Sequence, residues 1–440
     1  MRRVLMVSPH FPPDNNAGTH RTRLLAPYLE RYGWQPTVVT IDSRDYEGRI
    51  DPSLLELVPP SLRVVRCRAW SPAWTRAIGI GDLGLRALMG LHRLCGRLMT
   101  RERFDALFIT IYPTYPALLG PWLKRRFGVP FVLDYQDPWV GAWGDTVGGG
   151  PGNRVDFKSR ATRRLASWLE PRVISAADGV TAVSTRTYAD VLARNRHAPD
   201  LVCATIPIGG DPADFEAARR RATPNTWFNR DDGLLHFCYV GTLLPHGVTT
   251  LRGLLKAATF ARAAYPRAFE RLRLHFLGTS NQTGGSPEPR VLPHARELGL
   301  EAHVTEEPTR LHYLDALQVQ LDAHVLLLMG SSESHYTASK LYPALLAQRP
   351  IVALYHRDSS VVDLLRQRSK APSVELVTYS GDATEDDIAA AAAPAFARSL
   401  AAPVYNEADI DMAALTEFSA EHLAGRLAGV LDQVAIRAGR

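Results

Sequence analysis

The sequence of 440 residues is poor in cysteine, and its cysteines are far apart. The four are Cys67, Cys95, Cys203 and Cys238, and none has a neighbour at the spacing typical of a metal site. This scarcity excludes a disulfide-rich secreted scaffold and indicates buried thiols in a reducing compartment.

Long apolar runs and export signals are also missing. No run reaches the roughly 20 residues that a transmembrane helix needs. Arg2 and Arg3 precede only a short apolar segment, residues 4–7, which is too short for a signal peptide. No motif of a nucleic-acid-binding fold is found, so nucleic acid is not expected as a partner. We therefore expect a cytoplasmic protein.

The composition is that of a globular protein, with 46% hydrophobic and 22% charged residues, and the length suits two or three domains. The net charge of +6 is unevenly distributed. Residues 1–210 hold 28 Lys and Arg against 18 Asp and Glu, whereas the remainder is slightly acidic. A basic amino-terminal half favours an anionic acceptor or membrane surface, and peripheral contact with the inner face of a membrane is predicted.

Residues 325–355 show the clearest pattern. Apolar residues 325–329 predict a buried strand, residues 330–339 a polar loop, and the leucines that follow a helix. Pro350 ends that helix, and residues 351–354 predict a second strand. This is one unit of a parallel sheet, whose loop lies at the carboxyl end of a strand, where ligands bind in such sheets.

The chemistry of this loop suits phosphate. Ser339 offers a hydroxyl and Lys340 a cation directly before a helix, whose amino end attracts anions. The alternative is that Ser339 is only a helix cap and Lys340 a surface lysine.

The segment Ser339-Lys340-Leu341-Tyr342, followed by Arg349-Pro350-Ile351-Val352, resembles the donor site of GT-B nucleotide-sugar glycosyltransferases. It is most similar to family 4 and the related exopolysaccharide and O-antigen enzymes. The resemblance implies that Ser339, Lys340 and Leu341 bind the donor. The family usually has two glutamates, seven and fourteen residues before the proline, where this chain has Pro343 and Tyr336.

The amino terminus predicts a strand at residues 4–7, a loop, and a helix that begins at Thr19 or His20. Gly18, before the helix, would let the backbone approach a ligand closely, although a simple turn is the alternative. The stretch SPHFPPDNNAGTHR resembles the opening of family 4 enzymes, which implies a donor-side role for Gly18. His10 is a candidate on the acceptor side, although an isolated histidine is more often structural.

A further strand, at residues 130–133, ends in Asp134-Tyr135-Gln136-Asp137-Pro138-Trp139. Carboxylates accept hydrogen bonds from sugar hydroxyls and aromatic rings stack on sugars, so Asp134, Asp137 and Trp139 are acceptor-side candidates. Asp137 could instead be a helix cap or turn former. The resemblance favours function, with Asp137 orienting the acceptor, because family 4 enzymes need no conventional base-and-nucleophile pair.

Residues 234–240 predict the first strand of a second nucleotide-binding domain, with Gly241 and Thr242 at its end. The family usually has an arginine and a lysine next, which clamp the diphosphate. Here His246 lies roughly where that lysine would be, and a neutral histidine is a weaker phosphate partner.

Residues 78–99 predict a helix with an apolar side and a basic side. The predicted basic side consists of Arg86, His92, Arg93, Arg97, Arg101 and Arg103. Such a helix can lie in a membrane interface, although an ordinary surface helix packed on the sheet is the alternative.

Taken together, the sequence predicts an α/β protein with two Rossmann-like domains that face a cleft. Residues 1–208 would form the acceptor domain, 209–410 the donor domain, and 411–440 a helix that packs back across both. The resemblance implies transfer of a sugar from a nucleotide-diphosphate sugar to a glycan or lipid-linked acceptor, with retention and without a cofactor or metal. A catalytically silent homologue that holds a complex together, or a sugar-nucleotide epimerase, are the alternatives.

Overall fold

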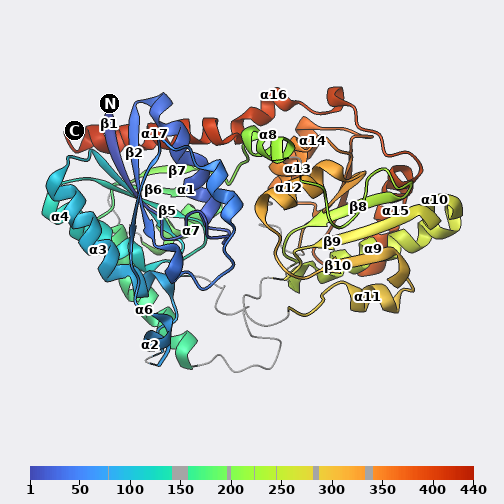
Figure 1. The fold of residues 1–440 in the computed structure, drawn as a ribbon, viewed down its shortest axis with the longest axis horizontal. Coiled ribbons are helices and arrows are strands. Elements are labelled where there is room, and N and C mark those ends of the chain that lie inside the picture. Colours follow the sequence, from blue (N-terminus) through green and yellow to red (C-terminus); the bar gives the residue numbers. More distant parts are fainter. Residues whose placement is uncertain are drawn as a thin grey trace. The chain divides into compact units, whose positions relative to one another are not determined.

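The computed structural model describes residues 1–77, 79–140, 157–195, 200–221, 223–243, 245–280, 287–331 and 340–440. The chain forms two compact units (Figure 1). Unit 1 contains Met1–Ile208 and Ala420–Arg440, and unit 2 contains Gly209–Ser419. Ser339 lies outside the described residues.

Unit 1 is built on a parallel sheet in the order β3-β2-β1-β4-β5-β6-β7. Its strands are β1 (Arg2–Val7), β2 (Trp34–Ile41), β3 (Arg63–Cys67), β4 (Ala106–Ile111), β5 (Phe131–Tyr135), β6 (Gly179–Ala182) and β7 (Val202–Thr205). Its helices are α1 (Thr19–Leu25), η1 (Ala26–Tyr32), η2 (Ser43–Asp45), η3 (Pro52–Leu57), α2 (Pro72–Ala77), α3 (Leu83–Arg101), η4 (Tyr115–Leu118), α4 (Leu119–Phe127), α6 (Phe157–Ile174), α7 (Thr185–Arg194) and α17 (Ala420–Arg437).

Both faces of this sheet are covered, as the alternation of buried side chains along β1 shows. Leu5 and Val7 belong to one hydrophobic cluster, with side chains of α3 and α4. Val4 and Met6 point to the opposite face and belong to another, with η1 and α17. The carboxyl-terminal helix therefore completes the core of unit 1.

Unit 2 is built on a parallel sheet in the order β10-β9-β8-β11-β12-β13. Its strands are β8 (Leu235–Val240), β9 (Leu272–Leu277), β10 (Val304–Glu307), β11 (Val325–Met329), β12 (Ile351–His356) and β13 (Val374–Tyr379). Its helices are α8 (Pro212–Arg221), η5 (Pro245–Gly247), α9 (Val248–Ala264), α10 (Pro266–Arg271), α11 (Leu292–Glu297), η6 (Glu301–His303), α12 (Tyr313–Asp322), α13 (Leu341–Leu346), α14 (Ser360–Arg368), α15 (Glu385–Ala401), η7 (Glu407–Asp409), α16 (Met412–Leu415) and η8 (Thr416–Phe418).

The predicted class, two Rossmann-like α/β domains, is confirmed. The strand order reverses between β1 and β4 in unit 1 and between β8 and β11 in unit 2. In open α/β sheets, such a reversal opens the crevice in which ligands bind, at the carboxyl ends of the strands. The loops that follow β1 and β8 are those in which the sequence placed Gly18 and Gly241. The prediction that the two domains face a cleft stays a prediction.

One predicted helix differs from the observed one. The helix predicted over residues 78–99 begins at Leu83, because the Asp82 side chain caps it by accepting a hydrogen bond from Leu85 N at 2.9 Å. In unit 2, Glu307 accepts a hydrogen bond from Thr309 N at 2.7 Å, so the segment before α12 forms a turn.

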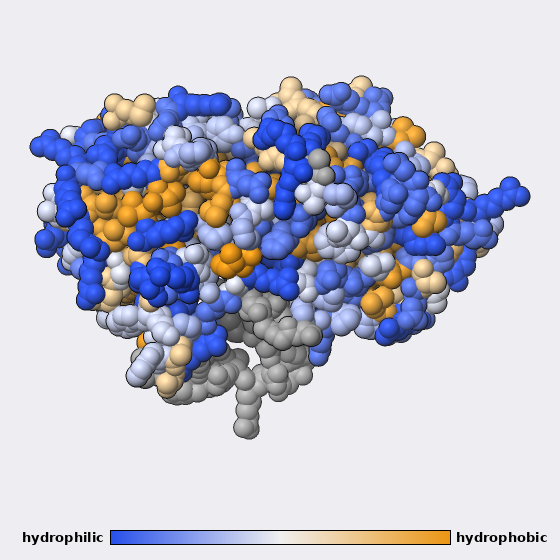
Figure 2. All heavy atoms as spheres, viewed as in Figure 1, coloured by the Kyte–Doolittle hydropathy of each residue, from blue (hydrophilic) through white to orange (hydrophobic). Residues whose placement is uncertain are grey.

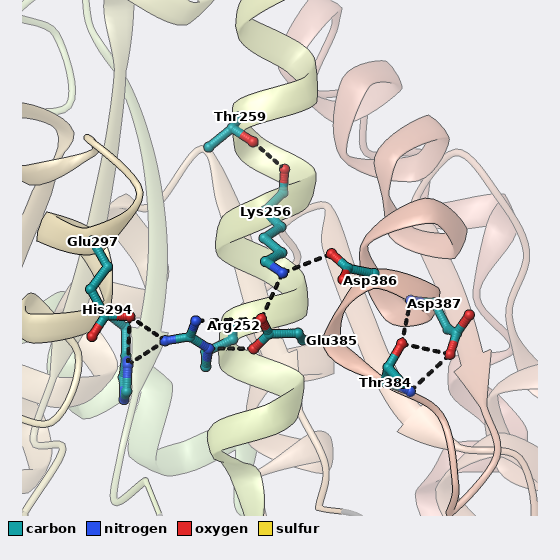
Figure 3. Close-up of polar contacts among 9 residues, drawn as sticks. All are labelled: Arg252, Lys256, Thr259, His294, Glu297, Thr384, Glu385, Asp386 and Asp387. Atoms are coloured by element: carbon teal, nitrogen blue, oxygen red, sulfur yellow. Dashed lines mark hydrogen bonds and ion pairs between the residues drawn. The ribbon is translucent and has the colours of Figure 1, made fainter.

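The helices α9 and α15 pack together in unit 2 through a polar network (Figure 3). Arg252 and Lys256 of α9 both pair with Glu385, at the first turn of α15. Thr384 caps α15: its hydroxyl accepts a hydrogen bond from Asp387 N at 3.2 Å, and the Asp387 carboxylate accepts one from Thr384 N at 2.9 Å. This reciprocal capping box fixes the start of α15.

We expect Thr384→Ala to lower the free energy of unfolding of unit 2 by about 1 kcal/mol, because Asp387 N loses its acceptor and the Asp387 carboxylate loses the hydroxyl that donates to it. Thermal unfolding of the full chain would measure it. Thr259→Ala is the matched control, since that hydroxyl bonds only to the Lys256 carbonyl of its own helix, at 2.7 Å. Equal melting temperatures for the two variants would contradict the capping role.

Candidate functional site

In unit 2, Lys340 and Gly241 come together at the reversal point of the sheet. Lys340 directly precedes α13, and Gly241 directly follows β8. Gly241 has a φ of +123°, and a Cβ atom there would lie 2.6 Å from Lys340 Cε. The lysine side chain therefore crosses the glycine backbone at close range, and only glycine leaves room for it.

The ammonium group of Lys340 is held by groups at the end of β8. Nζ donates to the Tyr239 hydroxyl at 2.7 Å and to the Thr242 carbonyl at 3.0 Å. It also lies 4.5 Å from the centre of the Tyr239 ring, within cation–π range. Tyr239 donates in turn to the Thr242 carbonyl at 2.9 Å. The lysine is thus fixed with its charge beside the β8 loop.

Burial of this ammonium group and, to a smaller extent, the nearby Arg310 guanidinium together lower the pKa of Lys340 to about 7. Among the described residues, no carboxylate opposes these two effects, so the charged form of Lys340 is poorly compensated there. An anion bound here would supply the missing charge. The arrangement can therefore hold a diphosphate and stabilise charge that develops on it.

The other donor-side candidates in unit 2 are placed differently. Thr242 contributes its carbonyl to the lysine, as described above. His246 lies exposed in η5. The Leu341 side chain is 4% exposed and packs in the core, so it could contact a donor only through its backbone N–H. Arg310 and Tyr239 were missed by the sequence analysis; the position of Arg310 three residues after β10 is the signal that could have found it.

We expect the affinity for a nucleoside diphosphate to fall as the pH rises above about 7, by up to about tenfold per pH unit. The free lysine loses its proton in that range, whereas the bound one, facing phosphate, keeps it, so binding takes up a proton. Titration calorimetry in two buffers of different ionisation enthalpy would measure this uptake. An affinity that does not change with pH would contradict it, and Lys340→Met should abolish the effect.

In unit 1, Asp134 is engaged in a buried ion pair. Arg21 donates to it in bidentate fashion, with Nε to Oδ2 at 2.8 Å and NH2 to Oδ1 at 2.6 Å. The Thr181 hydroxyl adds a third bond at 2.6 Å, and both charged side chains are almost fully buried. Arg21 also donates to the carbonyls of Ile206 and Pro207, at 2.5 and 3.1 Å. The ion pair of Arg21 and Asp134 therefore connects α1, β5, β6 and the segment after β7. This structure leaves the Asp134 carboxylate no room to bind a sugar.

Asp137 lies two residues beyond β5 and differs from Asp134 in having no donor among the described residues. Burial alone raises its pKa. A half-buried carboxyl group without a partner is suited to accept or donate one hydrogen bond to a ligand hydroxyl. Trp139, close to it in sequence, is 8% exposed and belongs to the hydrophobic core of unit 1. Its ring is packed against that core, which argues against sugar stacking.

Gly18 and His10 both contact Tyr112, which follows β4. A Cβ atom on Gly18 would lie 2.5 Å from the Tyr112 ring, so this glycine makes room for an aromatic side chain. Its backbone is helical, with φ −62°, and has no need of glycine. His10 bonds to Asp14 through Nδ1 and has its ring 5.5 Å from that of Tyr112. The loops after β1 and β4 therefore pack together at the reversal point.

The described residues contain no group of three or more His, Cys, Asp or Glu arranged to hold a metal ion.

Comparison with known proteins connects this geometry to a family. Residues 17–209 match the model of the "Glycosyl transferase 4-like domain". No curated protein matches the sequence.

Solved structures are similar over almost the whole chain. Anabaena Alr3699/HepE in complex with UDP and glucose has a TM-score of 0.58 at 14% identity, covering 98% of this chain and 100% of that one. An α,α-trehalose-phosphate synthase (UDP-forming) from Burkholderia vietnamiensis has a TM-score of 0.60 at 13% identity, covering 99% and 100%. The trehalose-6-phosphate phosphatase N-terminal domain of Candida albicans has a TM-score of 0.61 at 12% identity, covering 99% and 97%.

These likenesses concern the fold, and the family-model match concerns the sequence of unit 1. Residues 17–209 therefore match a glycosyl transferase 4-like domain, and the chain as a whole shares the two-domain α/β fold of these structures.

Proposed function

We propose that the protein is a glycosyltransferase that uses a UDP-sugar as donor and transfers the sugar to a glycan or lipid-linked acceptor, with retention of configuration and without a metal ion. The observation that carries the proposal is the lysine over Gly241, a poorly compensated cation at the place where such sheets bind nucleotides. Two of the similar structures support UDP as the nucleotide of the donor: the HepE structure contains UDP, and the Burkholderia synthase is named as UDP-forming.

Lys340 would act on the leaving group. As the bond between the anomeric carbon and the diphosphate oxygen breaks, negative charge grows on the diphosphate. A cation already fixed by Tyr239 and Thr242 needs no reorganisation to stabilise that charge. In the ligand-free protein, the same burial that lowers the lysine pKa strengthens its attraction for an anion.

On the acceptor side, Asp137 would orient the hydroxyl group that attacks the anomeric carbon. Its carboxyl group has no donor among the described residues, whereas Asp134 is fully engaged. Retention without a protein nucleophile follows from the family resemblance and requires only that Asp137 position the acceptor.

We further propose that unit 1 contacts a membrane surface to reach a lipid-linked acceptor. No helix in the described ranges has the length and apolarity to span a bilayer. Figure 2 shows hydrophobic residues gathered on one face of unit 1, apart from α2. Trp70 and Trp74, beside and within α2, are 54% and 82% exposed, and Arg93 and Arg97 of α3 are exposed. Tryptophan and arginine are typical of membrane interfaces.

Arg86, which the sequence predicts to lie on the basic side of α3, is not part of that surface. Arg86 is 1% exposed, pairs with Glu47 at 2.9 Å and donates to the Trp70 carbonyl at 2.8 Å. It holds the segment before α2 against α3 and does not face solvent. The prediction that Arg86 lies on a basic face is wrong, because helical periodicity does not show which charged residue has a buried partner.

Flotation with anionic liposomes would test the membrane contact. We expect the protein to float at low salt and Trp74→Ala to float several-fold less. Trp168→Ala, another exposed tryptophan, on α6, is the control. Protein that stays at the bottom of the gradient at low salt would exclude the contact.

Donor use would be tested by a calorimetric and hydrolysis screen across nucleotide sugars, repeated with Lys340→Ala. Binding of UDP-sugars with loss in the variant supports the proposal. If no nucleoside diphosphate binds at millimolar concentration, the chain is a catalytically silent homologue. Conversion of the donor sugar without any acceptor would indicate an epimerase.

A further inference from the structure

Unit 2 has a cavity at the end of its sheet where the strands begin, whereas Lys340 lies at the end where they finish. Its volume is about 1060 Å³, and its lining includes residues that directly precede three strands. Asp231 comes shortly before β8, Asp322 before β11 and Arg349 before β12. The cavity therefore lies at the amino ends of the strands, whereas Lys340 and Gly241 lie at the carboxyl ends. It is separate from the donor site.

Three arginines, Arg219, Arg230 and Arg349, line this cavity. The backbone holds two of them in place. Arg349 Nε donates to the Leu321 carbonyl at 2.7 Å, and Arg230 NH1 donates to the carbonyls of Asp322 and Ala323 at 3.0 and 2.8 Å. The remaining N–H groups of these guanidinium groups have no partner in the part of the chain that the structure describes.

None of the three arginines forms an ion pair with a described residue, whereas their neighbours do. Arg220 pairs with Glu216 at 3.7 Å and Arg221 with Asp315 at 3.3 Å. Burial and the charges of Arg230 and Arg219 lower the pKa of Arg349, and Asp322 opposes them. Three cations that repel one another and form no ion pair with a described residue are stabilised by a bound anion.

The rest of the lining offers more donors and one aromatic ring. The Asn225 amide nitrogen is buried and has no partner among the described residues, while its oxygen accepts from Trp227 N at 2.9 Å. The Trp227 side chain is half-buried at the cavity wall. Asp322 accepts from Gln318 at 2.9 Å, so part of its charge is already engaged. The carboxylates of Asp231 and Asp322 also line the cavity, so the three arginines against these two carboxylates leave it with a net charge of +1.

We propose that this cavity binds a phosphorylated small molecule with a ring, the phosphate between the three arginines and the ring against Trp227. The volume is that of a pocket for a small ligand, which favours such a molecule over a protein segment. Arginine is the side chain best suited to phosphate, because its N–H groups match the geometry of the oxygens. The site is independent of the proposed donor site.

The test uses the full chain with Lys340→Met as background, so that phosphate binding at the donor site is removed. The probes are phenyl phosphate and inorganic phosphate, measured by calorimetry. We expect Arg219→Ala to weaken both roughly tenfold or more, since it removes one charged donor. Arg219 is exposed and forms no ion pair, so its loss should leave the melting temperature unchanged. Arg220→Ala, the next residue of α8, is the matched control and should bind as the background does.

The variant Trp227→Leu tests the binding of the ring separately from the binding of the phosphate. It should weaken phenyl phosphate several-fold and leave inorganic phosphate unchanged. The proposal is overturned if neither probe binds at millimolar concentration, or if Arg219→Ala and Arg220→Ala bind equally well. If Trp227→Leu weakens the binding of phenyl phosphate and of inorganic phosphate equally, the proposal that the ring of the ligand lies against Trp227 is overturned.

Discussion

Lys340→Met is expected to lower kcat/KM for the nucleotide sugar by roughly 10²–10³-fold, because it removes the fixed cation at the developing charge of the diphosphate. The effect should be at least as large in kcat as in donor affinity, since the charge grows as the bond breaks. Steady-state kinetics with the donor found in the screen would measure both. The variant should melt no lower than the wild type, because methionine replaces a poorly compensated buried ammonium group.

Lys370→Met is the control for loss of a lysine. That side chain is 68% exposed and lies 3.8 Å from Asp409, far along the chain from the β8 loop. It should leave the kinetics unchanged. An active Lys340→Met enzyme would exclude the donor-side role of the lysine. Gly241→Ala should reproduce part of the loss, since its new Cβ atom would displace the lysine side chain.

Asp134→Ala is expected to destabilise unit 1 by about 3–5 kcal/mol, because it leaves the buried Arg21 charge without its partner. Thermal or urea unfolding would measure the change. The double variant Arg21→Met with Asp134→Leu should recover much of that loss, since no unpaired charge then remains.

Asp137→Asn is the matched comparison on the same strand end. Asp137 has no donor among the described residues, so this variant should keep the wild-type melting temperature and raise the KM of the acceptor. If Asp134→Ala instead kept full stability and affected only the acceptor, the sugar-binding role predicted from the sequence would be restored.

Much of unit 2 could be predicted because local signals agreed with the fold. The strand predicted over residues 325–329 is β11, and the helix and strand after it are α13 and β12. Gln348 adopts a positive φ of 54° there, where Pro350 was expected to stop the helix. Apolar runs bounded by polar loops and proline leave few alternatives.

The role of a charged residue was harder to predict. Asp134 and Asp137 both follow the same predicted strand, yet one is paired with Arg21, 113 residues away, and the other has no donor in the described ranges. Sequence distance hides such a partner. The sequence indicates Arg349 only as part of the segment that resembles a family 4 donor site, and its place in a cavity depends on α8 and the segment before β8.

The route of the chain through unit 2 has a practical consequence. Unit 2 begins at Gly209 and ends at Ser419, and Gly210 forms a β-bridge with Ser419, so its two ends are adjacent. Unit 2 is therefore a domain inserted into the chain of unit 1. It could be excised and produced alone, or exchanged for the corresponding segment of another transferase, with both junctions made at one spot. Such chimaeras would show which half selects the donor.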